Sequence, residues 1–298
     1  MSPQAFGIVL SVVRGGCQVV AGDQRVSLRL TGRQAHDEVE LAVGDEVRFD
    51  PVRRIVLERL PRRSQLERRR PRDDPRRRHV IAANIDRLAI VTAVCRPPFR
   101  AGLVDRMQLA ALAGGLDAIL VVNKLDLWKG PLPEEIRGFE VALPVLPVSA
   151  RTGSGLDALR EALAGRRSVF AGHSGVGKSS LLNALRPELR LATGDLGRRG
   201  ERGRHTTRSS IWLRLAGGAV VIDTPGIREL ASGVADPALL AELYPEVARL
   251  APACQFRDCA HVSEPGCAVR RALGQGSLSQ QRYAQYLRVR SDLARQEA

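Results

Sequence analysis

A glycine-rich loop in the middle of the chain has the residue types that bind phosphate. Its residues fit the pattern G-x-x-x-x-G-K-[ST], and they are Gly172, His173, Ser174, Gly175, Val176, Gly177, Lys178 and Ser179. The run at 168–171 predicts a strand before the loop, and the pattern at 179–185 predicts a helix after it. Backbone N–H groups in such a loop point at phosphate oxygens, and a helix N-terminus favours an anion. We therefore expect Lys178 to contact the β- and γ-phosphates of a nucleotide and Ser179 to bind Mg²⁺.

The base of that nucleotide is indicated by Asn123-Lys124-Leu125-Asp126, which fits N-K-x-D. The Asp126 carboxylate can accept hydrogen bonds from N1–H and the exocyclic amine of guanine, a donor pair that adenine lacks. The stem of Lys124 can lie along the base plane. Four residues are a weak signal by themselves, and a polar turn between a strand and a helix is the alternative. The motif predicts a guanine site and needs support from its neighbours.

Some support comes from Ser149 and Ala150, which follow an apolar run at 145–148. They resemble the S-A-[KL] element that contacts guanine from a neighbouring loop. Arg151 stands where that element has lysine or leucine. The pair is therefore supporting evidence only.

Ligands for Mg²⁺ and the γ-phosphate are expected later in the chain. Asp223-Thr224-Pro225-Gly226 fits D-x-x-G, in which the aspartate holds Mg²⁺ through water and the glycine amide senses the γ-phosphate. Upstream, Thr207, with Thr206 as the second choice, lies in a loop rich in glycine and arginine. A threonine there can bind Mg²⁺ and the γ-phosphate only while GTP is present, which is how a switch loop orders and releases. Incidental threonines in a basic loop are the alternative.

The hydrolytic machinery departs from the Ras-like pattern. Ras-like enzymes place a glutamine after D-x-x-G to orient water, whereas this chain has Ile227. Isoleucine cannot position water, so we expect slow intrinsic hydrolysis and help from another group. His205 is the candidate, beside Lys178 and Thr207 in the catalytic set, and a surface histidine in a loop is the alternative.

Three cysteines and a histidine near the end of the chain have spacing suited to a metal. They are Cys254, Cys259, His261 and Cys267. Four sulfur and nitrogen ligands suit tetrahedral structural zinc and leave no open position for catalysis. Unrelated buried cysteines are the alternative. The other two, Cys17 and Cys95, are expected to be small buried hydrophobes.

An alternation of strands and helices is expected to position the nucleotide-binding residues. Apolar runs at 88–94, 118–122, 145–148, 168–171 and 219–222 alternate with helical patterns at 104–112, 156–163 and 179–185. Such alternation predicts an α/β sheet that is mostly parallel, with one antiparallel hairpin of 211–215 and 219–222 around Gly217-Gly218.

The first 60 residues contain five short β-rich runs, which suit a small closed barrel such as an OB-fold. OB-folds bind nucleic acid through stacking aromatics, and only Phe6 and Phe49 are available here. A barrel that has only a structural role is therefore an equally acceptable interpretation. A helical stretch at about 280–295 ends the chain.

Charge and composition limit the classes of partner that the chain can bind. The 298 residues carry a net charge of +14, and nine arginines fall within 61–79. That excess favours a polyanion such as RNA, with a solvated basic linker as the alternative. No stretch approaches the ~18 apolar residues of a membrane span, and five unevenly spread cysteines argue against a disulfide framework. We expect a cytoplasmic protein with no membrane partner. Its expected parts are a barrel at 1–66, a basic linker at 67–80, a GTPase domain at 81–235 and a zinc-binding domain with a C-terminal helix at 236–298.

The order of the motifs indicates a circular permutation. In an ordinary GTPase the phosphate loop comes first, whereas here Asn123-Lys124-Leu125-Asp126 and Ser149-Ala150 precede it. With the segments Ala82-Ala83-Asn84-Ile85-Asp86, Gly172 to Ser180, His205-Thr206-Thr207, Asp223-Thr224-Pro225-Gly226 and the cysteine pattern, the chain resembles the ribosome small subunit-dependent GTPase family RsgA, also called YjeQ.

The resemblance implies a late assembly factor whose GTPase is stimulated by the small ribosomal subunit. It implies GTP or GDP, Mg²⁺ and one structural Zn²⁺ as cofactors, and the small subunit with its rRNA as partner. It also supports a catalytic role for His205. We expect a monomer. A permuted GTPase acting on the large subunit and an RNA-binding scaffold that uses GTP only as a ligand are the competing interpretations.

Overall fold

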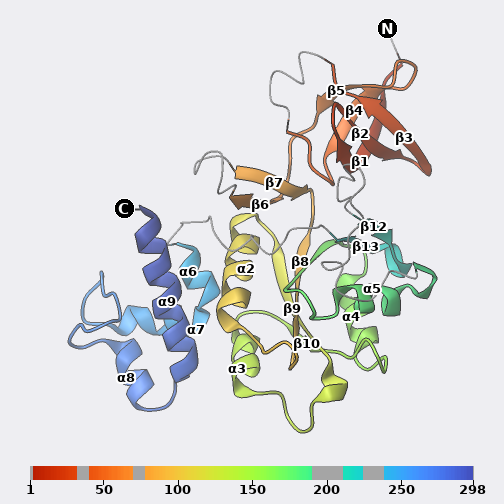
Figure 1. The fold of residues 1–298 in the computed structure, drawn as a ribbon. Helices are drawn as coiled ribbons and strands as arrows, with labels where there is room; N and C mark the ends of the chain where they lie inside the picture. The colour runs from red at the N-terminus through yellow and green to blue at the C-terminus, as the bar shows by residue number, and fades with distance from the viewer. Residues whose placement is uncertain (1–2, 32–39, 70–77, 190–210, 224–237, 298) are drawn as a thin grey trace, which may run out of the picture.

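The computed structural model describes residues 3–31, 40–69, 78–189, 211–223 and 238–297. An N-terminal barrel, a central mixed sheet with helices and a C-terminal helical lobe follow one another along the chain (Figure 1). Among the described residues, no helix combines the length and the apolar character that crossing a bilayer requires.

Five strands close the N-terminal barrel, as the sequence predicted. They are β1 (Ala5–Val13), β2 (Gly16–Ala21), β3 (Gln24–Arg29), β4 (Glu46–Asp50) and β5 (Ile55–Arg59), paired in the order β1-β2-β3-β5-β4 with β1 back against β4. Alternate side chains such as Val9, Val19 and Val47 fill the interior. Phe49 belongs to that interior, whereas Phe6 is 64% exposed. Only one of the two aromatic residues is therefore available for stacking.

The segment expected as a basic linker at 67–80 is partly a β-ribbon. Strand β6 (Gln65–Arg69) pairs antiparallel with β7 (Arg78–Ala83). Residues 67–69 and 78–80 of the expected linker lie in these two strands, and Val80 is buried. The many arginines concealed an apolar alternation that continues into Ala82, which is also buried.

The central sheet has six strands in the order β10-β9-β8-β11-β13-β12. They are β8 (Arg87–Ala93), β9 (Asp117–Asn123), β10 (Val145–Pro147), β11 (Arg167–Ala171), β12 (Ile211–Arg214) and β13 (Val220–Asp223). Five run parallel and β12 lies antiparallel to β13, so the predicted hairpin and the mostly parallel sheet are confirmed.

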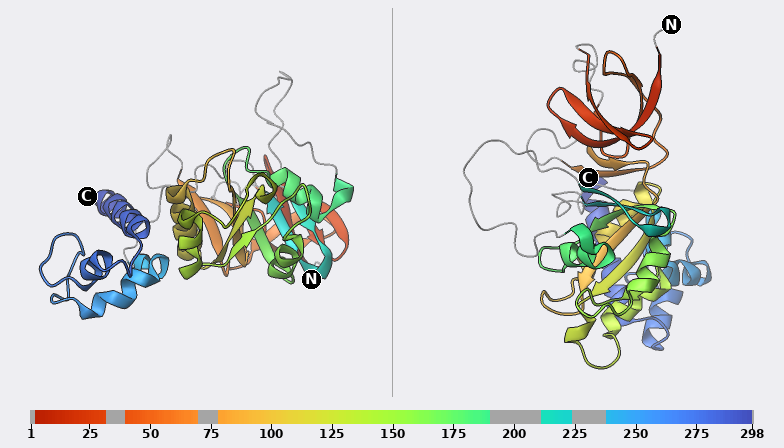
Figure 2. Two further views of the ribbon diagram at one scale, coloured as in Figure 1. Left: turned by 90° about the horizontal axis from the view of Figure 1, so that it is seen from below. Right: turned by 90° about the vertical axis from the view of Figure 1, so that its right-hand side faces the viewer.

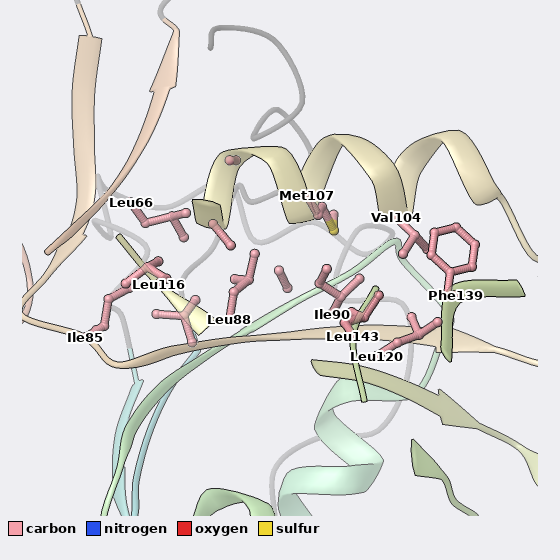
Figure 3. Packing of buried hydrophobic residues seen from close by; sticks show 14 of the residues in the cluster. Leu66, Ile85, Leu88, Ile90, Val104, Met107, Leu116, Leu120, Phe139 and Leu143 are labelled. Carbon is pink, nitrogen blue, oxygen red and sulfur yellow. The ribbon is translucent and has the colours of Figure 1, made fainter. Parts of the chain in front are cut away.

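Helices cover both faces of this sheet. Helices α2 (Ala101–Ala113) and α3 (Glu134–Arg137) lie on one face, and α4 (Leu156–Leu163) and α5 (Lys178–Leu185) lie on the other. Side chains alternate along the strands, so that Leu88 and Ile90 of β8 pack under α2 with Met107 (Figure 3). Their neighbours in β8 face the opposite cluster with Leu159 and Leu181. Burial on both faces explains why these strands are near-continuous apolar runs.

The C-terminal lobe packs against α2, as the views of Figures 1 and 2 agree. It contains α6 (Leu239–Leu243), α7 (Pro245–Leu250), α8 (Ala268–Gly274) and α9 (Gln280–Glu297). Its small core includes Tyr244 and Val269, and Leu109 of α2 belongs to the same cluster. At the other end of the sheet, Arg214 of β12 lies 3.5 Å from the carboxylate of Asp23 in the barrel.

Candidate nucleotide and metal sites

The strand order reverses between β8 and β11. From β8 the chain adds β9 and β10 on one side, and then β11 and β13 on the other. Ligands of open α/β sheets bind in the crevice at the carboxyl ends of strands beside such a reversal. The phosphate loop follows β11, Lys124 follows β9, and Asp223 ends β13. The topology therefore brings the predicted motifs of the described chain to one edge of the sheet.

Close packing explains the glycines of the phosphate loop. A Cβ on Gly172 would lie 2.1 Å from the carbonyl oxygen of Val91 in β8. Gly177 has φ of +92°, and a Cβ there would lie 2.4 Å from Nδ2 of Asn123. The Lys178 ammonium donates to the carbonyl oxygens of Gly172 at 2.8 Å and His173 at 3.1 Å, across the loop. The backbone is thus folded tightly around the lysine that the sequence assigned to the phosphates.

Asn123 joins the N-K-x-D motif to the phosphate loop. Its Nδ2 donates to the carbonyl oxygen of Val176 at 2.9 Å, and its Oδ1 accepts from the backbone N–H of Ala150 at 3.1 Å. One buried amide therefore ties three predicted motifs together. The sequence predicted that Asn123 contacts the nucleotide, but it did not indicate that Asn123 links these segments of the protein to one another.

Asp126 lies beside Ser149, as the pairing of the two guanine elements requires. The Ser149 hydroxyl donates to Oδ1 of Asp126 at 2.6 Å. Nε of Arg151 lies 2.8 Å from Oδ2, an ion pair that sequence reasoning missed. The Ser149 hydrogen bond and, after it, the Arg151 charge hold the pKa of Asp126 below its usual range against the effect of burial. The carboxylate is therefore ionised and oriented, as an acceptor for guanine must be.

Lys124 and His173 have partners at the edge of the same site. Lys124 has φ of +65°, and its ammonium donates to the carbonyl oxygen of Arg96 in the loop after β8. Nδ1 of His173 lies 2.9 Å from the carbonyl oxygen of Ser174. The loop before α2 thus forms a wall of the site that no motif indicated.

Asp223 lies close enough to Lys178 for their charges to interact. Burial raises the pKa of Asp223, and the Lys178 charge opposes that rise. Ser179 and Ser180 lie in the first turn of α5, next to Lys178. The remaining predicted ligands, His205, Thr206, Thr207 and Gly226, lie outside the described residues.

Cys254, Cys259, His261 and Cys267 converge in the C-terminal lobe. Their ligand atoms all lie within 4.8 Å of one another. Nδ1 of His261 is 3.5 Å from Sγ of Cys254 and 3.6 Å from Sγ of Cys267. A tetrahedral ion with metal–sulfur bonds of about 2.3 Å and a metal–nitrogen bond of about 2.0 Å would separate sulfur and nitrogen by about 3.5 Å. The two separations from His261 therefore fit a shared tetrahedral metal ion, and Cys259 lies close enough to complete its ligand set.

Backbone contacts hold these ligands in place. Sγ of Cys254 accepts from the N–H of Ala268 at 3.4 Å, and Sγ of Cys267 accepts from the N–H of Arg270 at 3.5 Å. The Tyr283 hydroxyl donates to the carbonyl oxygen of His261 at 2.5 Å. Such outer contacts orient the ligands of protein metal sites. Of the two remaining cysteines, Cys17 is buried as predicted and Cys95 is only half-buried.

A P-loop after β11, the Asp126 carboxylate beyond the end of β9 and the partly buried Asp223 at the end of β13, in permuted order on one sheet, define a circularly permuted GTPase domain. A family model described as RsgA GTPase matches residues 59–232. The chain belongs to the RsgA GTPase family.

Curated relatives agree with that assignment over nearly the whole chain. A protein of Gemmatimonas aurantiaca named small ribosomal subunit biogenesis GTPase RsgA is 36% identical over 98% of this chain and 99% of its own length. A protein of Chlorobaculum parvum with the same name is 40% identical over 93% of this chain and 86% of its own length.

Solved structures support the architecture. YjeQ from Thermotoga maritima superposes with a TM-score of 0.76 at 29% identity and covers 98% of this chain and 99% of its own. YloQ, described as a circularly permuted GTPase, gives a TM-score of 0.70 at 24% identity, with 99% and 96% covered. The barrel, the permuted domain and the lobe with the Cys/His cluster form one shared fold.

Proposed function

We propose that this chain is a GTP hydrolase that binds the small ribosomal subunit, assists its late maturation, and is stimulated by that subunit. The observation that carries the proposal is the Asn123 amide, which links the phosphate loop to the elements around Asp126. A single nucleotide that spans the two motifs would be read as guanine at one end and held by its phosphates at the other. The names of the relatives supply the subunit.

The loop Gly172–Ser180 would hold the phosphates, with Lys178 against the β- and γ-phosphates. Ser179, Thr207 and Asp223 would hold Mg²⁺, and Thr206, Thr207 and Gly226 would respond to the γ-phosphate. Mg²⁺ would neutralise charge on the phosphates when bound. His205 would help to position water, because Ile227 cannot.

The C-terminal metal would be zinc in a structural role. Three thiolates and one imidazole leave no open position and prefer zinc to magnesium or calcium. Metal analysis of purified protein should give one zinc per chain, and Cys259→Ser should lose it. A chain that folds fully with no bound metal would refute this assignment.

The domains of the chain would have different roles in binding RNA and GTP. The barrel at 1–66, the basic segment at 67–80 and the metal-bearing lobe at 236–298 would bind rRNA around the GTPase domain at 81–235. A monomer on the ribosomal subunit, and hence in the cytoplasm, fits this arrangement. The concentrated arginines would neutralise phosphates, so binding should weaken steeply with salt.

The test is GTP turnover by purified protein alone, with small subunits and with large subunits. Supplying a missing catalytic group in trans is typically worth about 10³–10⁵ in rate, so small subunits should stimulate strongly. Lys178→Ala should abolish turnover in every condition. Fast turnover by protein alone contradicts the dependence on a subunit, stimulation by large subunits alone favours the competing GTPase, and no turnover at all favours a GTP-binding scaffold.

A further inference from the structure

We propose that Arg151 is a positioning residue that determines guanine specificity, acting through the Asp126 carboxylate. The inference rests on the proposed function, because it assumes that Asp126 reads a guanine base. Arg151 stands at the one position where the second guanine element departs from its pattern. Its guanidinium lies on the same carboxylate that would meet the base.

Several contacts orient the Asp126 carboxylate from within the protein. A carboxylate offers about four lone-pair positions, two on each oxygen. Ser149 takes one on Oδ1 at 2.6 Å, and Arg151 takes one on Oδ2 at 2.8 Å. The backbone N–H of Asp126 itself takes a third position. Arg151 therefore orients Oδ2 of the carboxylate, as Ser149 orients Oδ1.

The loop that carries Arg151 is fixed beside Asp126. The Ala150 N–H donates to Oδ1 of Asn123 at 3.1 Å, so the residue before Arg151 is attached to the nucleotide motif. On the other side, the Thr152 N–H donates to the Ser149 hydroxyl at 3.1 Å. The Arg151 backbone is thus held between two hydrogen bonds. Its side chain has only to extend to reach Oδ2.

Burial distinguishes this pair from an ordinary surface ion pair. Exposed pairs contribute little, because water screens both charges. Here the Arg151 side chain is 76% exposed, but the Asp126 side chain is only 8% exposed. A bound base would exclude more water from the carboxylate. The ion pair then holds the acceptor geometry where water cannot substitute for it.

Competition binding with fluorescent GDP tests the role. Arg151→Leu, which installs a residue the guanine element accepts, should raise the Kd for GDP about tenfold, as expected for losing one charge-assisted contact, and leave that for ADP unchanged. Arg151→Lys should recover part of the loss. Arg160→Leu is the matched control, since Arg160 pairs with Asp157 at 2.7 Å on α4, and it should leave both affinities unchanged. Equal thermal midpoints verify that all variants fold.

The outcomes separate this inference from the proposed function. If wild-type protein shows no preference for GDP over ADP, the proposed function fails and the inference falls with it. If wild-type protein prefers GDP and Arg151→Leu binds both nucleotides as well as wild type, the inference alone is overturned.

A second background tests whether Arg151 acts through the carboxylate. Asp126→Asn removes the ion pair and presents an amide that complements xanthine, so xanthosine diphosphate can probe that variant. Arg151→Leu should have no further effect there. A tenfold loss in that background would mean that Arg151 contacts the nucleotide directly, which would overturn the positioning role.

Discussion

Two arginine–aspartate pairs in this molecule have the same chemistry and opposite surroundings. Arg151 and Asp126 meet at the nucleotide site, where the arginine is largely exposed. Arg282 of α9 and Asp105 of α2 meet at 3.3 Å between the GTPase domain and the C-terminal lobe, where the two side chains are only 3% and 1% exposed. The first pair faces a place where a ligand can arrive, and the second is closed off from water.

The surroundings shift the two aspartates in opposite directions. Ser149 and Arg151 lower the pKa of Asp126, whereas burial raises the pKa of Asp105 to about 6 despite Arg282. Arg282 has many further partners, since it also binds Glu246 at 2.8 Å and lies over the rings of Phe139 and Tyr244. The comparison indicates that an arginine can orient an accessible carboxylate at one site and join two parts of the chain at another.

Replacing Arg282 should give the largest effect on stability. Arg282→Met leaves Asp105 and Glu246 without their cation in a buried interface, which costs about 3–5 kcal/mol of unfolding free energy. Denaturant unfolding measures the loss. Adding Asp105→Leu should restore part of it, because an apolar pair avoids the uncompensated charge. A loss below about 1 kcal/mol would show that the interface does not depend on this pair.

Replacing Asp126 should instead affect binding. Asp126→Ala removes two charge-assisted hydrogen bonds to guanine, which costs about 3 kcal/mol, or about 100-fold in the Kd for GDP. Competition binding and a thermal scan on the same sample measure the two properties. A variant that unfolds at much lower temperature while keeping its GDP affinity would reverse the assignment of the two pairs.

The two aspartates should also differ in pH dependence. Between the ordinary aspartate value of 3.8 and about 6, Asp105 holds a proton in the folded chain and has lost it in the unfolded chain. Folding stability from this group therefore falls as pH rises through that window and is constant above it. Comparing unfolding free energies of wild type and Asp105→Asn from pH 4 to 7 isolates the slope. An unchanged slope in the variant would assign the titration to another group.

An exposed pair should show the smallest effect. Arg160→Leu breaks a contact between two exposed side chains one helical turn apart, so its unfolding free energy should stay within about 0.5 kcal/mol of wild type. A loss comparable to that of Arg282→Met would mean that burial does not explain why the Arg282–Asp105 pair stabilises the fold more than an exposed pair does.

Local patterns predicted most of the fold. Period and turn residues placed the five barrel strands, and the helix at 156–163 matches α4 at both ends. The β-ribbon at 65–83 was missed because charge dominates its composition, whereas its pairing depends on alternate residues such as Leu66. The domain contacts of Arg282 were not predictable either, since they join residues 177 positions apart in the sequence.

Candidate site residues could be identified from the sequence where they belong to a short motif with a known chemical role. Lys178 lies inside its glycine-rich loop, Asp126 lies beside Ser149, and the four Cys and His residues converge. Arg151 was noticed only as a departure from a pattern, because a sequence does not show that a side chain reaches back to a residue on another loop. The same holds for Arg96, whose carbonyl oxygen accepts from Lys124.

Isothermal titration of the wild-type chain with GDP and with ADP shows whether the two motifs bind one guanine nucleotide. If the loop around Lys178 and the carboxylate of Asp126 bind one guanine nucleotide, GDP should bind at least about 100-fold more tightly than ADP, since adenine leaves the carboxylate without its donors. Equal affinities for the two nucleotides would contradict the account.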